Sequence, residues 1–388
     1  MEIAIDMLKE DFPIIKKVAY MNNASYTPMP FYSIKAMTDF LVECSINGPD
    51  SPTVVDDIER RAKEARNEIS KLLNCSADEV VLTQSTTEGL NYVANGLQWR
   101  KGETVIIRDG NHEHPANYIP WLRLKKRGVT VKKMQIDNNG FFDIKELKEA
   151  IDKEKRTRLA VFSHALFNTG SILPVAEIGG ITTKKQVMFC LDQAQTIGCL
   201  PVDVKKIGCD FAAFPGSKWL CGPLGSGVFY CSKKAVEKIE PLQSGAESAF
   251  ALDDERIAYK AMPDRLQTGF RNWAGMVGLT ASLRYVTRLG INNIRKMNME
   301  LANMLREALK KMEHVTVYGP EEENSRTSIV SFNVNHIEAG DVVKRLEEKG
   351  IIFAKRDICR KMIVRASPHF FNQAAEIERA IEIIKKLQ

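Results

Sequence analysis

Short apolar runs alternate with amphipathic stretches along the first two thirds of the chain. Residues 55–73 carry apolar side chains at helical spacing, which predicts a helix. We predict strands at Val80–Thr83, Thr104–Arg108 and Val129–Gln135. Short and nearly continuous apolar runs follow at Leu159–Ser163, Val187–Asp192, Asp210–Phe214 and Gly227–Tyr230, and such runs are typical of strands buried on both faces. Helical patterns lie between several of them, at Thr86–Leu97, Pro115–Lys126 and Asp143–Ile151. This alternation predicts an α/β fold with a mainly parallel sheet.

The pattern changes after about residue 265. A long helical stretch over Met276–Met312 is expected to break near Gly290. The remaining chain predicts strands and helices in the order of a smaller α+β domain: strands at Val315–Tyr318, Ser328–Val334, Ile351–Lys355 and Lys361–Ala366, and helices at Gly340–Lys349 and Ala374–Leu387. We therefore expect a large domain over 21–265, a small domain over 266–388, and an N-terminal segment, 1–20, that packs on the small domain.

Composition excludes several classes of protein. The 388 residues are 44% hydrophobic and 27% charged, which is ordinary for a folded protein with a large core. The net charge of +6 is mild and includes no block of five like charges, so we expect no nucleic-acid partner. No apolar stretch approaches the roughly 18 residues of a membrane span. The acidic N-terminus does not have the pattern of a signal peptide, and we expect no membrane association.

The eight cysteines form no CxxC pair, which argues against a zinc site or a thioredoxin-type motif. Several lie in apolar runs and are interpreted as buried free thiols, such as Cys190 and Cys231. This use of cysteine favours a reducing compartment, and we expect a cytoplasmic protein.

Ligands of open α/β sheets bind beyond the carboxyl ends of the strands, so the residues that follow each strand are candidates for chemistry. Thr86 and Thr87 follow the strand Val80–Thr83 at the start of a helix. Free amides at a helix start, with hydroxyl groups beside them, can bind a phosphate. The alternative is simple N-capping by Thr86 or Thr87, with Glu88 in the first turn.

Two charged residues follow apolar strands. Asp192 ends the strand Val187–Asp192, where a carboxylate needs a cationic partner. A protonated pyridine nitrogen or a structural salt bridge would meet that need. Lys218 lies between an apolar strand and an apolar dipeptide. A desolvated lysine has a lowered pKa and can act as a nucleophile or form a Schiff base.

His112 and His114 could form a metal-binding pair, but no third ligand is evident. We interpret His114 as an imidazole that stacks on a planar ligand. Arg365 ends an apolar strand and is a natural bidentate anchor for a carboxylate, with surface ion pairing as the alternative.

Taken together, these segments resemble the class V aminotransferase family of pyridoxal-phosphate enzymes, particularly its cysteine desulfurase and isopenicillin-epimerase-like branches. The resemblance covers nearly the whole chain in the right order. Its motifs are Tyr20–Ser25 (like YLNNA), Ser85–Asn91 (the phosphate-binding turn), Glu113–Asn117 (like EHHAN), Asp192–Gln195 (like DGAQ), Asp210–Gly222 (the cofactor-lysine segment) and Arg365 in RASPHFFN.

The resemblance implies the fold type I of these enzymes, in which helices flank a mainly parallel seven-stranded sheet. It also implies pyridoxal 5'-phosphate as cofactor and a role for each matched residue. Lys218 would carry the cofactor as a Schiff base, and Asp192 would pair with its ring nitrogen. The other implied roles are phosphate binding by Thr86, Thr87 and Ser217, stacking by His114, contact with the phenolic oxygen by Gln195, and substrate binding by Arg365 and Asn23.

The resemblance further implies an L-amino acid substrate and a homodimer. We expect a desulfurase-like C–S cleavage, from cysteine to alanine plus sulfur, with a possible sulfur-acceptor protein. An aminotransferase or epimerase-type reaction on another amino acid is the alternative, and a non-catalytic cofactor binder is a third. Cys359, six residues before Arg365, is the only nearby candidate for a catalytic persulfide carrier, and a structural thiol is the other interpretation.

Overall fold

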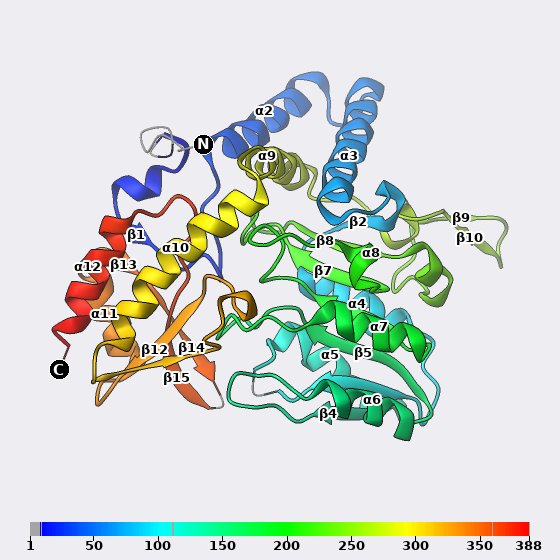
Figure 1. Cartoon of the computed structure of the whole chain (residues 1–388). Coiled ribbons are helices and arrows are strands. Elements are labelled where there is room, and N and C mark those ends of the chain that lie inside the picture. The colour runs from blue at the N-terminus through cyan, green and yellow to red at the C-terminus, as the bar shows by residue number, and fades with distance from the viewer. Residues whose placement is uncertain (1–7, 9, 111, 359, 388) are drawn as a thin grey trace.

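The computed structural model describes residues 8, 10–110, 112–358 and 360–387 (Figure 1). Its larger sheet has seven strands in the order β2-β8-β7-β6-β5-β3-β4. Their bounds are Val80–Thr83 (β2), Thr104–Arg108 (β3), Thr130–Met134 (β4), Thr157–Ser163 (β5), Met188–Asp192 (β6), Phe211–Pro215 (β7) and Gly227–Cys231 (β8). The strands from β3 to β7 pair in parallel, and β8 runs antiparallel to both of its neighbours. The predicted mainly parallel, seven-stranded sheet is confirmed.

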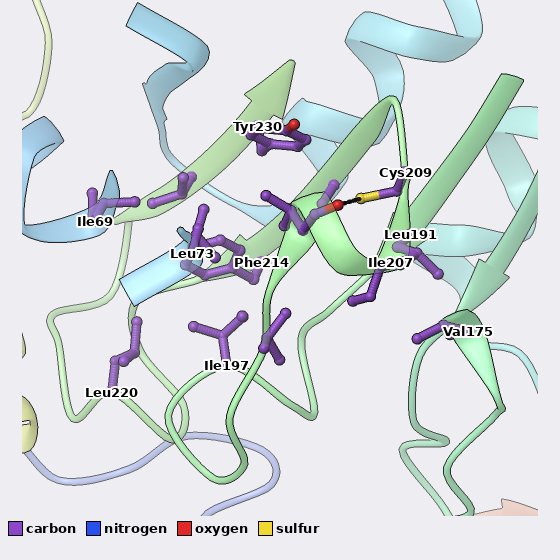
Figure 2. Close-up of a cluster of buried hydrophobic side chains, with 14 of the residues drawn as sticks. Ile69, Leu73, Val175, Leu191, Ile197, Ile207, Cys209, Phe214, Leu220 and Tyr230 are labelled. Atoms are coloured by element: carbon purple, nitrogen blue, oxygen red, sulfur yellow. Dashed lines mark hydrogen bonds between the residues drawn. The ribbon is translucent and has the colours of Figure 1, made fainter. Parts of the chain in front are cut away.

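Apolar side chains cover both faces of this sheet. Alternate residues of one strand enter different clusters, since Val80 and Leu82 belong to one core and Val81 to the other. Figure 2 shows part of the first core, where Leu73 lies near Phe214. The surrounding helices are α2 (Phe31–Asn47), α3 (Pro52–Leu73), α4 (Thr86–Gly96), α5 (Ile119–Arg123), α6 (Ile144–Lys153), α7 (Val175–Lys184), α8 (Val204–Ile207) and α9 (Trp273–Leu289). Burial on both faces explains why most of these strand sequences are nearly continuous apolar runs, whereas the edge strand β4, with the sequence TVKKM, has only Met134 buried.

A four-stranded antiparallel sheet forms the C-terminal part, in the order β11-β12-β15-β14. Its strands are Val315–Tyr318, Val330–Val334, Lys361–Ala366 and Ala354–Ile358 in that order, and its helices are α10 (Ile291–Lys310), α11 (Ala339–Glu347) and α12 (Ala374–Lys385). The N-terminal strand β1 (Ala19–Tyr20) pairs in parallel with β13 (Ile351–Ile352). The N-terminal segment therefore lies beside the C-terminal sheet, as Figure 1 shows.

The predicted helical stretch near the C-terminal third is two helices, α9 and α10, which meet at Gly290. This glycine has φ 83°, a conformation that favours glycine over other residues. Because α9 packs on α2 and α3, we propose that the small domain begins at Gly290 rather than at 266.

Some predicted elements were wrong in detail. The expected helix Pro115–Lys126 is a short α5 between two 3-10 turns, because proline at 115 and at 120 cannot continue a helix. The expected strand Ile351–Lys355 is divided into β13 and β14. Helix α2 and the antiparallel hairpin of β9 (Ala249–Ala251) and β10 (Ile257–Tyr259) were not predicted.

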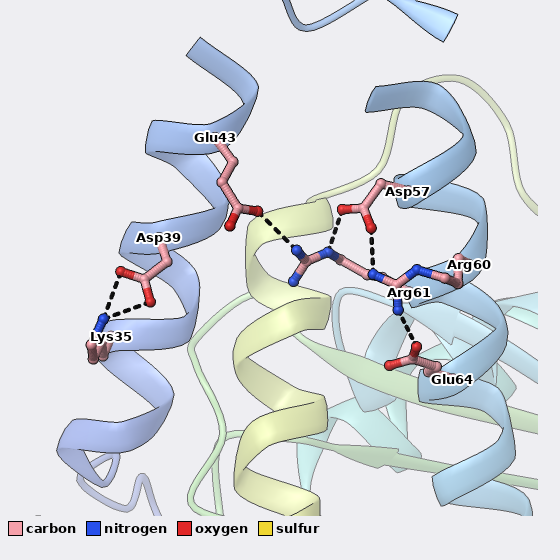
Figure 3. Close-up of polar contacts among 7 residues, drawn as sticks. All are labelled: Lys35, Asp39, Glu43, Asp57, Arg60, Arg61 and Glu64. Atoms are coloured by element: carbon pink, nitrogen blue, oxygen red, sulfur yellow. Dashed lines mark hydrogen bonds and ion pairs between the residues drawn. The ribbon is translucent and has the colours of Figure 1, made fainter. Parts of the chain in front are cut away.

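Helix α2 is held to its neighbours by polar contacts and one buried aromatic side chain. Arg61 of α3 binds Asp57 of its own helix at 2.5 Å and Glu43 of α2 at 2.9 Å (Figure 3). Exposed ion pairs of this kind contribute about 0–1 kcal/mol each. The buried Phe40 adds apolar contact. In contrast, much of the remaining apolar surface of α2 is exposed, at Phe31, Tyr32, Leu41, Val42 and Ile46.

No helix within the described part of the chain combines the length and the apolar character needed to cross a membrane.

Candidate active site

A cavity of about 360 Å³ lies at the carboxyl ends of the larger sheet, where the C-terminal sheet closes over it. We call it the strand-end cavity. Residues that the sequence placed far apart line it together: Thr86, Thr87, His114, Asp192, Gln195, Ser217, Lys218 and Arg365. Its position agrees with the rule that open α/β sheets bind ligands beyond their carboxyl ends.

Lys218 follows the end of β7 and faces the strand-end cavity. Desolvation lowers the pKa of its ammonium group to about 8, and the charges of Arg365 and Arg356 act in the same direction, against the carboxylate of Asp192. Among the residues that the structure describes, Lys218 forms no ion pair. An amine that loses its proton this readily is a competent nucleophile toward an aldehyde.

Asp192 ends β6 and is 4% exposed. The Ala194 amide donates a hydrogen bond to Oδ1 at 2.8 Å. Burial raises the pKa of the carboxyl to about 6, against the effects of the Ala194 amide, Lys218 and Arg108. Within the described residues Asp192 forms no salt bridge, so the structure does not contain the structural pairing considered from the sequence. A cationic ring nitrogen in the cavity would supply the missing partner.

The start of α4 forms one end of the cavity. Ser85 is its N-cap, because its Oγ accepts a hydrogen bond from the Glu88 amide at 3.1 Å. The predicted capping role of Thr86 or Thr87 was therefore wrong, and both threonines line the cavity instead. The carboxylate of Glu88 accepts hydrogen bonds from the Gln84 amide and the Tyr92 hydroxyl. Because the Glu88 carboxylate is held by these two hydrogen bonds, the positive N-terminal end of α4 is suited to bind a phosphate.

His114 is held in a fixed orientation on the wall of the strand-end cavity. The Nδ1 atom of His114 accepts a hydrogen bond from the Ala116 amide at 3.2 Å, which places the proton of the neutral ring on Nε2. Desolvation, assisted by the charges of Lys218 and the two arginines Arg356 and Arg365, lowers the pKa of His114 to about 4. The ring is therefore neutral near pH 7 and can stack on a flat ligand without adding charge.

Gln195 is fixed through both ends of its amide. Its Nε2 donates to the Ala24 carbonyl at 2.9 Å, and its Oε1 accepts from Trp219 Nε1 at 2.9 Å. The second Nε2 hydrogen has no acceptor in these two contacts. It can therefore be donated to an oxygen in the cavity.

Arg365 of β15 is 1% exposed, so the alternative of surface ion pairing was wrong. It donates to the Phe167 carbonyl at 2.6 Å, to Asn22 Oδ1 at 3.1 Å and to Ser25 Oγ at 2.5 Å. These acceptors are neutral, so its positive charge remains available. A guanidinium fixed in this way is suited to bind a substrate carboxylate.

Sequence reasoning missed Arg356, which also lines the cavity and binds Ser25 Oγ. In the pairing of β14 with β15, Ala354 lies opposite Arg365 and Ile363 lies opposite Arg356. Residues two apart share a face of a strand, so both arginines project from one face. A correct prediction of the β14–β15 register would have identified Arg356, because it places this residue on the same face as Arg365.

One predicted residue, Asn23, is not among those that line the cavity. Asn23 is buried, and its Nδ2 donates to the Ser367 carbonyl at 2.9 Å. It joins the N-terminal segment to the residue that directly follows β15, and we propose that it positions its neighbours Ala24 and Ser25, which do line the cavity. Cys359 lies outside the described residues.

The groups present fit pyridoxal phosphate. A nucleophilic amine, a buried carboxylate without a cationic partner, and a helix start beside hydroxyl groups match the aldehyde, ring nitrogen and phosphate of that cofactor. No cluster of three or more potential metal ligands occurs in the described part of the chain.

The comparisons with known proteins agree with this interpretation. The profile of the family described as Aminotransferase class-V matches residues 19–380. A probable cysteine desulfurase of Methanothermobacter thermautotrophicus is 34% identical and covers 98% of this chain and 97% of its own. The apo structure of cysteine desulfurase from Thermococcus onnurineus NA1 has a TM-score of 0.93 at 27% identity, over 100% of this chain and 98% of its own. The predicted fold, cofactor and enzyme class are confirmed, and the chain belongs to the class-V aminotransferase family.

Proposed function

We propose that this protein is a desulfurase that uses pyridoxal phosphate to cleave the C–S bond of cysteine. The observation that carries the proposal is that Lys218 and Arg365 line one cavity. This arrangement offers a base and a carboxylate anchor to the same amino acid. The choice of cysteine is supported by the similarity over nearly the whole chain to proteins named as cysteine desulfurases.

The chain's own residues have distinct roles in this proposal. Arg365 binds the substrate carboxylate and thereby orients the Cα–H bond toward Lys218, whose amine takes the proton. Asp192 holds a proton on the ring nitrogen, while His114 stacks on the ring. Ser217, Thr86 and Thr87 hold the phosphate. When bound, pyridoxal phosphate supplies the electron sink for the charge that develops at Cα.

The sulfur must leave to a thiol. A thiolate attacks the substrate sulfur and becomes a persulfide, the C–S bond breaks toward carbon, and a proton completes alanine. None of the seven described cysteines lines the strand-end cavity, and burial raises the pKa of all seven, Cys44, Cys75, Cys190, Cys199, Cys209, Cys221 and Cys231. We therefore propose Cys359 or an external thiol as the acceptor, with a sulfur-acceptor protein downstream.

The test is product analysis with cofactor-loaded protein. Cysteine plus a thiol reductant should give alanine and sulfide in equal amounts without any keto acid. Amino transfer that requires a keto acid and releases no sulfide would support the aminotransferase alternative instead. Racemised substrate without sulfide would support the epimerase alternative. A Cys359→Ala variant that keeps full activity with the reductant would remove Cys359 as carrier.

A second candidate function is C–S cleavage of cystine, and Arg356 is the observation that favours it. The amino acid needs one arginine for its α-carboxylate, whereas the cavity contains two. The second carboxylate of cystine would bind the half-buried Arg356. Here loss of the Cα proton expels cysteine persulfide, so the reaction gives pyruvate and ammonia rather than alanine.

A homodimer and a cytoplasmic location belong to the same proposal. Phe270 is 94% exposed, and the apolar residues of α2 form a further exposed surface. Apolar surface of this kind is typical of subunit interfaces. All seven described cysteines are free thiols, which supports a reducing compartment. Sedimentation equilibrium tests the dimer, and a monomer at micromolar concentration would contradict it.

A further inference from the structure

A fully buried ion pair lies behind the wall of the strand-end cavity. Arg108 Nε and Glu113 Oε1 are 3.3 Å apart, and their side chains are 0% and 1% exposed. Buried ion pairs are costly to form, and well-packed apolar residues often replace them without loss of stability. We propose that Arg108 and Glu113 are positioning residues that together fix the end of β5 and set the charge state of the Asp192 carboxylate. This inference rests on the proposed function only in requiring that Asp192 faces the cofactor ring.

The hydrogen bonds show how the pair fixes the end of β5. Arg108 Nη2 donates to the Ser163 carbonyl at 2.9 Å. The amide and hydroxyl of Ser163 donate to the two carboxylate oxygens of Glu113, at 3.2 and 2.6 Å. Ser163 lies opposite Asp192 in the sheet, and the His164 amide donates to the Asp192 carbonyl at 2.8 Å. The ion pair therefore holds the strand end that adjoins Asp192.

A second contact ties Glu113 to the segment that carries the ring-stacking histidine. Asn117 Nδ2 donates to Glu113 Oε2 at 3.1 Å, and Trp121 Nε1 donates to Asn117 Oδ1 at 3.1 Å. His114 directly follows Glu113 in the chain. Fixing Glu113 therefore also fixes the backbone from which the His114 ring projects.

The charges of the pair act on Asp192 in opposite directions. Arg108 lowers the pKa of the Asp192 carboxyl and Glu113 raises it, while Lys218 is the other charge that faces this group. Arg108 Nη1 is buried and forms no hydrogen bond within the described residues. The pair thus places one positive and one negative charge beside Asp192, and each compensates the other.

Variants that neutralise only one member of the pair should separate the effects of the two charges on Asp192. Glu113→Gln leaves Arg108 uncompensated, so Asp192 stays ionised at lower pH, and the added net positive charge makes the cofactor ring nitrogen lose its proton at lower pH. Arg108→Gln leaves Glu113 uncompensated and should shift the titration the other way. The expected displacement is about one pH unit in each direction. The measurement is the 15N chemical shift of bound, ring-labelled pyridoxal phosphate across a pH series, which does not depend on turnover.

Two further variants make the result decisive. Arg108→Gln combined with Glu113→Gln removes both charges and should return the titration close to that of the wild type, even if a single variant folds poorly. Arg158→Gln is the matched control, because Arg158 of β5 pairs at 3.0 Å with Glu103, which directly precedes β3, and neither residue lines the cavity. It should leave the titration unchanged.

Shifts in the same direction in both single variants, or no shift in either, would overturn the inference. Its failure is distinguishable from that of the proposed function. A wild-type protein that binds the cofactor but forms no sulfide or persulfide would contradict the function, and the titration would still be readable.

Discussion

Arg356 and Arg365 project from the same face of the β14–β15 hairpin and donate hydrogen bonds to the same oxygen, Ser25 Oγ. Two guanidinium groups with one shared neutral acceptor repel each other. Neither forms an ion pair within the described residues. An anionic substrate relieves this repulsion, and the pair therefore attracts a carboxylate into the cavity.

Replacing Arg365 should weaken substrate binding more than it slows the chemical step. Arg365→Lys keeps the charge but loses the bidentate geometry, and we expect KM for the amino acid to rise about 10- to 100-fold, the equivalent of about 1–3 kcal/mol. Steady-state kinetics measure this change. Lys361→Gln, which removes an exposed cation from the same strand, is the control. An unchanged KM in Arg365→Lys would show that Arg365 does not anchor the substrate carboxylate.

Arg356 should decide between the two candidate substrates. Arg356→Gln is expected to lower kcat/KM for cystine by about tenfold or more, because the second carboxylate loses its partner. The same variant should change kcat/KM for cysteine only slightly. Equal effects on both substrates would show that Arg356 does not discriminate between them.

Burial of Asp192 makes the stability of the cofactor-free protein depend on pH. The folded pKa of about 6 lies above the ordinary value of 3.8, so the folded state binds the proton more tightly than the unfolded state does. Stability from this group is therefore present below about pH 4 and is lost as pH rises through 6, by up to about 3 kcal/mol. Urea unfolding at both pH values measures the loss, and Asp192→Asn should abolish this contribution. A variant with the same slope as the wild type would contradict the assignment.

The N-cap of α4 should connect stability with cofactor binding. Ser85→Ala removes the acceptor of the Glu88 amide, and we expect a loss of about 1 kcal/mol in the free energy of unfolding. It should also raise the Kd for pyridoxal phosphate, because we propose that the helix start binds the phosphate. Thr38→Ala, on an exposed part of α2, is the matched control. A stability loss with unchanged cofactor affinity would confine Ser85 to a structural role.

Most of the fold could be predicted from the sequence because both faces of the larger sheet are buried. Continuous apolar runs such as Val80–Thr83 are strong signals when helices cover both sides. Helix α2 escaped prediction because its outward face is also apolar, at Leu41 and Ile46 for example, so it has no clear amphipathic pattern.

The candidate site was partly predictable for a related reason. Lys218 and Asp192 were found because a charge at the end of an apolar strand is unusual, and the structure places both on one cavity. Arg356 and the Arg108–Glu113 pair were missed because their roles depend on strand register and on contacts between distant segments. Such relationships are not visible in local sequence patterns.

The central claim is that the amine of Lys218 binds the aldehyde of pyridoxal phosphate. The most direct measurement is to reduce the cofactor-loaded protein with borohydride and to locate the attached pyridoxyl group by peptide mass spectrometry. We expect the label on Lys218 of the wild-type protein and no label in Lys218→Ala. A label on a different lysine, or none on the wild-type protein, would contradict it.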